Sequence, residues 1–384
     1  MSPDRLRVVV AGYVVRFPVG GNAWAYLNYA LGFSDLGHEV AFLETSEDYP
    51  SCYDPVRGVV DRDPTYGLGF MGAACAAVGL GDRWAYHDDH NGTWHGPFAG
   101  GMEDFCRTAD LVVNVSAANS LDPWCCGVPH RVFVDTDPAF EQIRQLTVPR
   151  RRERASEHNH FLTFAENIDS PGCAIPDDGI GWRPTRQPVA LKHWPVAPGR
   201  PDADFTSVMQ WKSYKPREFD GRTYGLKSDS FGAFVDLPAR VGPRFTLALG
   251  SEDAPRSELE AAGWHLVDPL VVTRDLAAYQ RFIRDSRAEF AVAKHGYVVS
   301  RSGWFSERSA GYLASGRPVL AQDTGFGSAL PTGEGLIAFS DVVEAAAGVE
   351  AISARYEHHC RAARAVAEEH FASSGVLTRL LESL

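Results

Sequence analysis

Uninterrupted apolar runs alternate with helical periods from the beginning of the chain. Residues 6–13 are almost entirely apolar, which predicts a strand buried on both faces of a parallel sheet. A loop containing Gly20 and Gly21 follows, and then a predicted helix over about residues 22–36. Residues 38–44 return as a second apolar run. This order of strand, loop, helix and strand predicts a βαβ unit.

The same alternation continues along the chain, which divides into two halves. A segment rich in proline, glycine and aspartate, residues 197–204, is the predicted linker. Other apolar runs predict strands at residues 111–115, 131–135, 161–165, 205–211, 245–249, 264–267 and 290–293. We therefore expect an α/β protein with two Rossmann-like domains, residues 1–198 and 205–370, followed by a helical segment, residues 371–384.

Composition and charge narrow the class of protein. The 384 residues are 45% hydrophobic and 11% aromatic, which is enough for packed cores and argues against disorder. The formal net charge of −12 argues against nucleic acid or an anionic membrane as the main partner. No apolar stretch approaches the roughly 20 residues of a membrane span, and the N-terminus does not resemble a signal peptide.

The most informative stretch is residues 288–326. It predicts a short strand, a loop with glycine and serine, a helix, a second strand and a polar turn. A helix that begins after such a loop presents unpaired backbone N–H groups and the positive end of its dipole. Ser306 is a good N-cap for this helix, and Arg301 and Arg308 add positive charge nearby. The stretch therefore predicts a site for a diphosphate group.

This stretch resembles the nucleotide-sugar-binding half of GT-B glycosyltransferases of the family 1 and family 4 type. In those enzymes a helix ending in an A-x-G-x-P-V run follows the donor-phosphate loop, and a turn with Asp, Thr and Gly follows the next strand. The matching residues here are Ala314, Gly316, Pro318, Val319, Asp323, Thr324 and Gly325. Gly303 and Trp304, with Ser306 close behind, are similar to the G-W-N-S segment of plant-type enzymes.

The resemblance implies a GT-B fold, in which two Rossmann-like domains face a central cleft. A final helix, here residues 376–384, would cross back to the N-terminal domain. The resemblance also implies a nucleoside-diphosphate sugar as co-substrate on the C-terminal domain, an acceptor on the N-terminal domain and no resident cofactor. One departure affects the mechanism. Retaining members often carry two glutamates eight positions apart, but Gly303 and Gly311 stand at those places, and Glu307 fits neither.

The candidate donor-binding residues are cationic, hydroxyl-bearing, aromatic or small residues in the loops that follow predicted strands. Cations and hydroxyl groups would contact phosphate, and an aromatic ring would stack on a base or a sugar face. Glycine would let the backbone approach the ligand closely. The full set is Gly20, Gly21, Trp211, Tyr214, Lys227, Lys294, His295, Arg301, Ser306, Arg308, Ser309, Thr324, Gly325 and Phe326.

An inverting transfer needs a carboxylate or a histidine that faces the cleft and deprotonates the acceptor. Asp137 follows the apolar run at residues 131–135 and therefore lies at the carboxyl edge of the predicted sheet. It is the first candidate for the base, and Glu166, which follows the next run, is the second. His158 and His160 are weaker candidates on the approach to the same strand. Caps of turns and helices use the same residue types.

A dinucleotide fingerprint and a group of metal-type residues also occur in the sequence, but neither has the sequence context that its function requires. Residues 67–72 spell the dinucleotide fingerprint G-x-G-x-x-G, but polar residues 61–66 stand where the required buried strand should be. Residues 86–91 and His95 have the residue types of a metal site, but their spacing matches no established ligand pattern. The seven cysteines are scattered without a C-x-x-C pair, which favours reduced thiols in a cytoplasmic enzyme. We therefore expect no metal site.

The sequence thus predicts a two-domain glycosyltransferase that moves a sugar from a nucleoside diphosphate to a small or medium-sized metabolite. The alternatives are a nucleotide-sugar epimerase of the same fold and a noncatalytic nucleotide-sugar-binding protein. A dehydrogenase ranks last, because its one fingerprint stands in the wrong context. Inversion and retention both stay open, as do a monomer and a homodimer.

Overall fold

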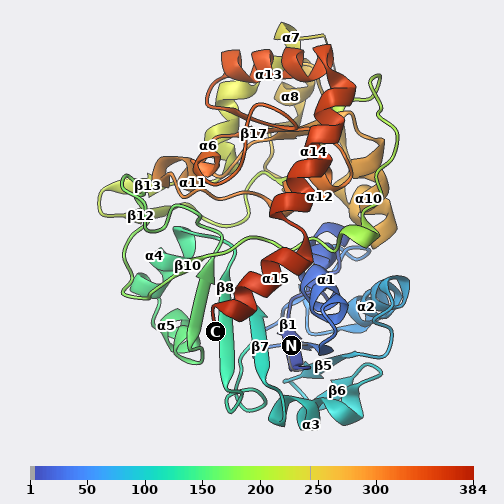
Figure 1. Ribbon diagram of the computed structural model, residues 1–384, viewed down its shortest axis with the longest axis vertical. Coiled ribbons are helices and arrows are strands. Elements are labelled where there is room, and N and C mark those ends of the chain that lie inside the picture. Colours follow the sequence, from blue (N-terminus) through green and yellow to red (C-terminus); the bar gives the residue numbers. More distant parts are fainter. Residues whose placement is uncertain (1–4, 243) are drawn as a thin grey trace.

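Two parallel β-sheets, one in each half of the chain, form the frame of the molecule (Figure 1). The computed structural model describes residues 5–242 and 244–384. In Figure 1 the N-terminal half lies below the C-terminal half, and the last helix runs from the upper half across the lower one.

The N-terminal sheet has eight strands in the order β10-β9-β8-β7-β1-β2-β5-β6, and only β5 and β6 pair as antiparallel neighbours. The strands are β1 (Arg7–Ala11), β2 (Glu39–Thr45), β5 (Trp84–Asp88), β6 (Thr93–His95), β7 (Leu111–Val115), β8 (His130–Asp135), β9 (His160–Thr163) and β10 (Arg183–Pro184). In the centre of the sheet, Val8 of β1 pairs with Val40 on one side and Leu111 on the other. This central position explains the uninterrupted apolar run, because both faces of such a strand are covered.

The C-terminal sheet has six parallel strands in the order β15-β14-β11-β16-β17-β18. They are β11 (Phe205–Gln210), β14 (Phe245–Gly250), β15 (Trp264–Val267), β16 (Ala288–Ala291), β17 (Val319–Gln322) and β18 (Leu336–Phe339). In each sheet the first strand lies between the second and the fourth parallel strand of its half. This is the strand order of a Rossmann fold, which opens a crevice where the order reverses.

Helices cover both faces of the N-terminal sheet. Alternate residues of β1 point in opposite directions, so Val8 and Val10 pack with α1 while Val9 and Ala11 pack with α3. The helices of this half are α1 (Gly20–Asp35), α2 (Thr65–Val78), α3 (Met102–Arg107), α4 (Phe140–Thr147) and α5 (Pro149–Ser156). A short hairpin, β3 (Cys52–Asp54) with β4 (Val59–Asp61), follows β2.

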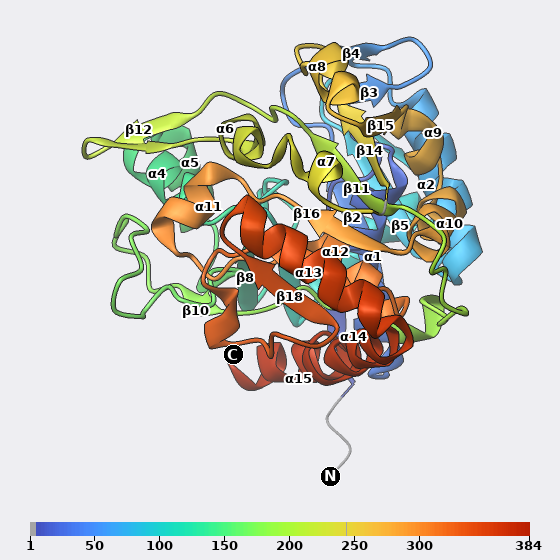
Figure 2. The same ribbon diagram turned by 90° about the horizontal axis from the view of Figure 1, so that it is seen from above.

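The C-terminal half contains the remaining helices and a second hairpin. The helices are α6 (Lys227–Phe231), α7 (Leu237–Arg240), α8 (Arg256–Ala261), α9 (Pro269–Thr273), α10 (Leu276–Asp285), α11 (His295–Ser300), α12 (Glu307–Ala314), α13 (Val342–Ala354), α14 (Tyr356–His370) and α15 (Ser373–Glu382). The hairpin is β12 (Arg217–Phe219) with β13 (Arg222–Tyr224). Seen from above, it extends to one side, where β12 contacts α4 of the other half (Figure 2).

Helix α1 joins the two halves. The indole N–H of Trp24 donates to the carbonyl oxygen of Leu276 in α10 at 3.2 Å, and its ring lies 5.1 Å from the ring of Trp194. At the start of α1, a Cβ atom added to Gly20 would lie only 2.3 Å from the carbonyl oxygen of Asp275. The glycine therefore allows the two halves to approach each other closely.

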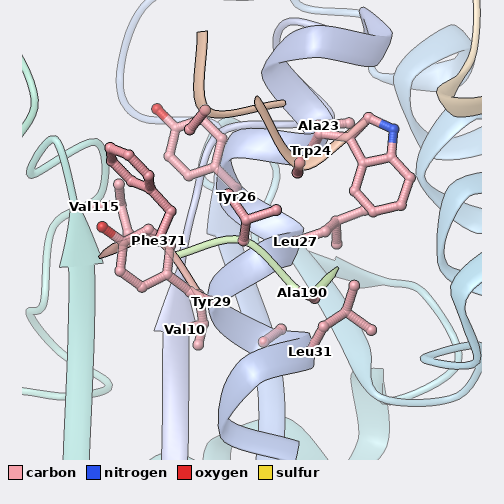
Figure 3. Packing of buried hydrophobic residues seen from close by; sticks show 14 of the residues in the cluster. Val10, Ala23, Trp24, Tyr26, Leu27, Tyr29, Leu31, Val115, Ala190 and Phe371 are labelled. Atoms are coloured by element: carbon pink, nitrogen blue, oxygen red, sulfur yellow. The ribbon is translucent and has the colours of Figure 1, made fainter. Parts of the chain in front are cut away.

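The last helix returns to the N-terminal half, as expected. The chain crosses at Phe371, whose carbonyl oxygen accepts a hydrogen bond from the backbone N–H of Val189 at 2.7 Å. The N–H of Ser373 donates to the carbonyl oxygen of Val189 at 2.9 Å. Figure 3 shows Phe371 among side chains of α1, β1 and β7. Helix α15 then packs on α1, where a Cβ atom on Gly32 would lie 2.5 Å from Leu377.

The structure agrees with the apolar pattern and explains one misleading motif. Each predicted strand is present, with ends that differ by at most two residues from the apolar runs. The glycines of residues 67–72 lie inside α2 and form no loop between a strand and a helix. Gly67 instead allows a close helix contact, because a Cβ atom there would lie 1.9 Å from the carbonyl oxygen of Val15. None of the helices in the described ranges has both the length and the apolar composition that crossing a membrane requires.

Candidate active site in the cleft between the two halves

A cavity of about 580 Å³ lies where the carboxyl ends of the two sheets face each other. The N-terminal half contributes Phe17 from the connection between β1 and α1, Gly21 from the first turn of α1, and Asp137 from the loop after β8. The C-terminal half contributes Met209 at the end of β11 and Arg308 at the start of α12. Ligands of open α/β sheets bind at this edge, so this cavity is the candidate active site.

Several of the predicted donor-binding residues meet in this cavity, although they are far apart in the sequence. Those in its lining are Gly21, Lys227, Lys294, Ser306 and Arg308. Tyr214 lies directly beside it, because its hydroxyl group accepts a hydrogen bond from Lys294 Nζ at 2.8 Å. Gly20 is the residue before the cavity and is buried against α10.

The other predicted donor-binding residues lie outside the cavity lining. Trp211 packs in the C-terminal core, with its ring 5.4 Å from that of Phe231. Arg301 follows α11 with a positive φ of 50°, and its side chain is exposed. The imidazole of His295 accepts a hydrogen bond from a backbone N–H group at 3.4 Å. Ser309, Thr324 and Phe326 are buried behind the start of α12, and Gly325 contacts Asn167 of the N-terminal half. None of these side chains therefore lines the cavity.

Asp137, the first candidate for the base, is fully occupied by a network that joins the two halves. Its Oδ1 accepts hydrogen bonds from Lys294 Nζ at 2.8 Å and the Tyr297 hydroxyl at 2.5 Å. Its Oδ2 accepts from Arg144 Nη2 and the Tyr214 hydroxyl, both at 2.6 Å. Burial alone would raise the pKa of Asp137, but Lys294 and Arg144 hold it well below its usual range. A carboxylate with four donors and a low pKa is a poor base, so the structure argues against this role.

Glu166, the second candidate for the base, is not part of the cavity lining. It forms an ion pair with Arg186, which also donates to the carbonyl oxygen of Ala329 at 2.9 Å. Glu166 therefore stabilises the junction between the halves, and the structure argues against a base at this position. The weaker candidates His158 and His160 do not line the cavity either.

Arg308 lines the cavity, but its positive charge already has a partner inside the protein. Its guanidinium group forms an ion pair with Glu289 of β16 and donates to the carbonyl oxygen of Val208 at 2.8 Å. Glu289 is fully buried. The backbone N–H of Arg308 donates to Ser306 Oγ at 3.2 Å, so Ser306 caps α12 as predicted. Only part of the Arg308 charge is therefore available to a ligand.

Two charged side chains in the cavity lining have no ion-pair partner. Among the described residues, no carboxylate lies within 4.0 Å of Lys227 Nζ and no cationic nitrogen lies within 4.0 Å of the Glu307 carboxylate. Burial, together with the charges of Arg308 and Lys294, lowers the pKa of Lys227 well below its ordinary value. Burial raises the pKa of Glu307. Both pKa shifts arise because a charged group has left water without gaining a partner of opposite charge.

The sequence did not reveal three of these side chains as site residues. Glu307 follows the N-cap of the expected helix, but the spacing rule drawn from related folds did not select it. One turn later in α12, the ring of Trp194 lies 3.0 Å from the place where a Cβ atom of Gly311 would be. A glutamate at Gly311 would therefore need Trp194 to move. Arg144 and Tyr297 carry no local signal, because only the tertiary structure brings them to Asp137.

No group of three or more His, Cys, Asp or Glu side chains within residues 5–242 and 244–384 is arranged to hold a metal ion. Residues 86–91 have the residue types of a metal site and include the end of β5. Within them, His87 Nδ1 lies 2.6 Å from Asp89 Oδ1. The imidazole ring packs 4.7 Å from the ring of Trp94 and 5.1 Å from that of Trp124. These contacts place His87 in the packing of the sheet edge.

Comparison with known proteins gives different results for sequence and for structure. No protein-family model matches the chain, and no curated protein matches it in sequence. The structure is similar to Anabaena HepE in complex with UDP and glucose, with a TM-score of 0.60 and 12% identity over 99% of this chain and 100% of that chain. It is also similar to alpha-glucosyltransferase in complex with UDP, with a TM-score of 0.57 and 10% identity over 98% of this chain and 99% of that chain.

A further structure of alpha-glucosyltransferase, in complex with UDP-glucose and DNA containing an abasic site, has a TM-score of 0.55 at 10% identity. It covers 98% of both chains. These likenesses extend over both sheets, the cleft between them and the returning C-terminal helix. They confirm the expected architecture: this chain has the GT-B fold.

Proposed function

We propose that this protein is a glycosyltransferase that binds a nucleoside-diphosphate sugar in the cleft and transfers the sugar to a small or medium-sized acceptor. The observation that carries the proposal is the unpaired Lys227 in the cavity, beside the capped start of α12. A half-buried cation without a partner of opposite charge attracts an anion, and the first turn of a helix favours the same sign of ligand charge. A diphosphate group meets both requirements.

Different residues of the cavity have different roles in the proposed transfer. Lys227 and those first-turn N–H groups of α12 that Ser306 does not cap bind the diphosphate and stabilise the negative charge that develops as it leaves. Lys294 is held in place by Asp137 and Tyr214 and extends the positive surface. These cations neutralise the diphosphate without a metal ion. The proposed transfer requires the nucleotide-sugar as co-substrate and no resident cofactor.

Glu307 is the carboxylate that the cavity offers for acceptor chemistry. Its raised pKa brings it closer to the neutral range in which a general base works best. In an inverting transfer the acceptor oxygen bonds to the anomeric carbon as the bond between that carbon and the diphosphate oxygen breaks. The proton of the acceptor hydroxyl group passes to Glu307, and the nucleoside diphosphate leaves with the electron pair.

UDP is the proposed nucleotide, because the similar structures of HepE and alpha-glucosyltransferase hold UDP or UDP-glucose. We would titrate the protein calorimetrically with UDP, GDP, ADP, CDP and TDP, with and without magnesium. The proposal expects micromolar binding of UDP that magnesium does not change. If none of the nucleotides binds to protein shown to be folded, the proposal is wrong.

Product analysis separates the proposed transfer from the alternatives. Incubation of UDP-glucose with an acceptor releases UDP and a glycoside if the protein is a transferase. An epimerase would instead return a second nucleotide-sugar without an acceptor. A noncatalytic binding protein would bind the nucleotide-sugar without turnover.

A further inference from the structure

A second hollow, of about 810 Å³, adjoins the cavity of the proposed donor site. Both are lined by Phe17, Tyr53, Gln210, Pro269 and Leu270, so a ligand can extend from one into the other without leaving the cleft. In the view from above, the β3–β4 hairpin lies beside α8 and β15 of the C-terminal half (Figure 2). The hollow lies between these elements.

Aromatic side chains form the N-terminal wall of this hollow. The ring of Phe17 is stacked 6.3 Å from that of Tyr13 and 5.5 Å from that of Tyr53. All three rings are half-buried, and Tyr49 beside them is 47% exposed. The row is held rigidly, because the backbone N–H of Tyr53 donates to the carbonyl oxygen of Arg16 at 2.9 Å. Such a preformed row of rings presents flat apolar surface to a ligand.

Exposed apolar side chains are frequent in the segments that border the hollow, and two of them, Tyr49 and Val60, line it. Five of the eight large hydrophobic side chains that are exposed in the described ranges lie in residues 49–60 or 269–271. They are Tyr49, Val56, Val59, Val60 and Val271. Single exposed apolar residues are ordinary on a protein surface, but a group of them beside a hollow marks a binding surface.

The charges around the hollow restrict what it can bind. On the hairpin side, Asp54, Asp61 and Asp63 all pair with Arg57, and these three carboxylates outnumber Arg57 and the neighbouring Arg62. On the facing side, Asp268 and Glu252 accompany Arg256, whose guanidinium donates to a backbone carbonyl oxygen at 2.6 Å. This excess of carboxylates repels the phosphates of nucleic acid and the surface of an anionic membrane.

We propose that this hollow binds the acceptor of the proposed transfer and that the acceptor carries a planar apolar ring without negative charge, as a neutral phenol does. The proposal rests on the proposed function, since it places the acceptor next to the donor. The ring of the acceptor stacks on Phe17 and Tyr53 and faces Pro269 and Leu270. Its hydroxyl group points into the donor cavity that these residues share.

The test uses 2-naphthol, a neutral bicyclic phenol, as the probe. Its binding to the full chain is measured at neutral pH by fluorescence, with and without saturating UDP. The double variant F17A/Y53A is expected to bind naphthol about thirtyfold more weakly, because it removes two ring contacts of about 1 kcal/mol each and about 1.4 kcal/mol corresponds to tenfold. Tyr49→Ala, which removes an exposed side chain and leaves the cores intact, is expected to weaken binding about threefold.

Tyr66→Ala is the matched control, because Tyr66 is a half-buried tyrosine that lines a different hollow between α2 and α10. It should leave naphthol binding unchanged. The proposal is overturned if the wild type does not bind naphthol, if F17A/Y53A and Tyr49→Ala both bind it normally, or if UDP displaces it. Adsorption to phosphatidylglycerol vesicles that F17A/Y53A abolishes would also overturn it, in favour of a lipid surface. UDP binding is measured separately, so a failure of the donor site is distinguished from a failure of the acceptor hollow.

Discussion

The loop after β1 and the cavity at the start of α12 both contain charged groups that are shielded from water, but they neutralise these charges differently. Glu44 of β2 accepts hydrogen bonds from three successive backbone N–H groups of this loop at 2.7–2.8 Å and from Arg16 Nε at 3.3 Å. In the cavity, Lys227 and Glu307 have no ion-pair partner among the described residues. Burial of charge is therefore no sign of function by itself. A charge with every partner inside the chain builds structure, whereas a half-buried charge without one is available to a ligand.

The largest expected effect tests the structural side of this comparison. Glu44→Gln removes the charge that compensates Arg16 and weakens the acceptor of three backbone N–H groups. The free energy of unfolding should fall by about 3–5 kcal/mol, as for other buried ion pairs that lose one partner. Urea unfolding measures this change. The control is Arg240→Ala, which removes an exposed ion pair with Asp236 and should have a far smaller effect. Equal losses in both variants would contradict the structural role of Glu44.

The next prediction concerns the unpaired cation. Lys227→Met should weaken UDP binding by about 1.5–3 kcal/mol, because it removes a charged hydrogen bond to phosphate. It should not lower the free energy of unfolding of the free protein, because the lysine has no ion pair to lose and methionine is easier to bury. Calorimetry and urea unfolding measure the two effects. Lys212→Met is the matched control, since Lys212 pairs with Asp253 outside the cavity and should affect neither. If Lys227→Met lowered the free energy of unfolding without weakening UDP binding, Lys227 would have a structural role like that of Glu44.

The smallest effect is the pH dependence of the Asp137 network. Lys294 and Arg144 hold the pKa of Asp137 below its unfolded-state value of about 3.9. Its contribution to stability is therefore complete above about pH 5 and is lost as the pH falls through 4 towards the folded-state pKa. Asp137→Asn should lower the free energy of unfolding by about 1–3 kcal/mol at pH 7 and by clearly less at pH 3.

Urea unfolding of both proteins at the two pH values checks this prediction. Glu141→Gln changes a neighbouring buried carboxylate that pairs with Arg144 and Arg151, and it controls for general loss of charge in α4. A stability difference between wild type and Asp137→Asn that does not depend on pH would show that the ionised carboxylate is not what joins the two halves.

The sheets could be predicted from the sequence because burial dictates their composition. A central parallel strand such as residues 6–13 must be largely apolar on both faces, and the shortness of the run and its valines favour a strand over a buried helix. The hairpins β3–β4 and β12–β13 escaped prediction, because three-residue strands at the surface need neither apolar faces nor a regular period.

The site could be predicted only in part, because a sequence does not reveal which polar atoms are already paired. Lys294 and Ser306 were found from their positions beside a strand end and at a helix start. Asp137 satisfied the same positional rule, but donors from both halves of the chain occupy it. The spacing of the glutamates in related folds does not select Glu307, although its carboxylate has no ion-pair partner among the described residues. The pattern of partners is a tertiary property and needs the structure.

The double crossing of the chain between its halves has a mechanical consequence. The two passages run side by side and are tied together by hydrogen bonds between Val189 and the backbone of Phe371 and Ser373. If one flexible segment connected the halves, they could twist and slide freely. The two hydrogen-bonded segments instead act together as one narrow strap. Such a strap resists torsion and translation and leaves rotation about one axis as the softest motion. A rotation about this strap would open and close the cleft while keeping its two faces in the same register.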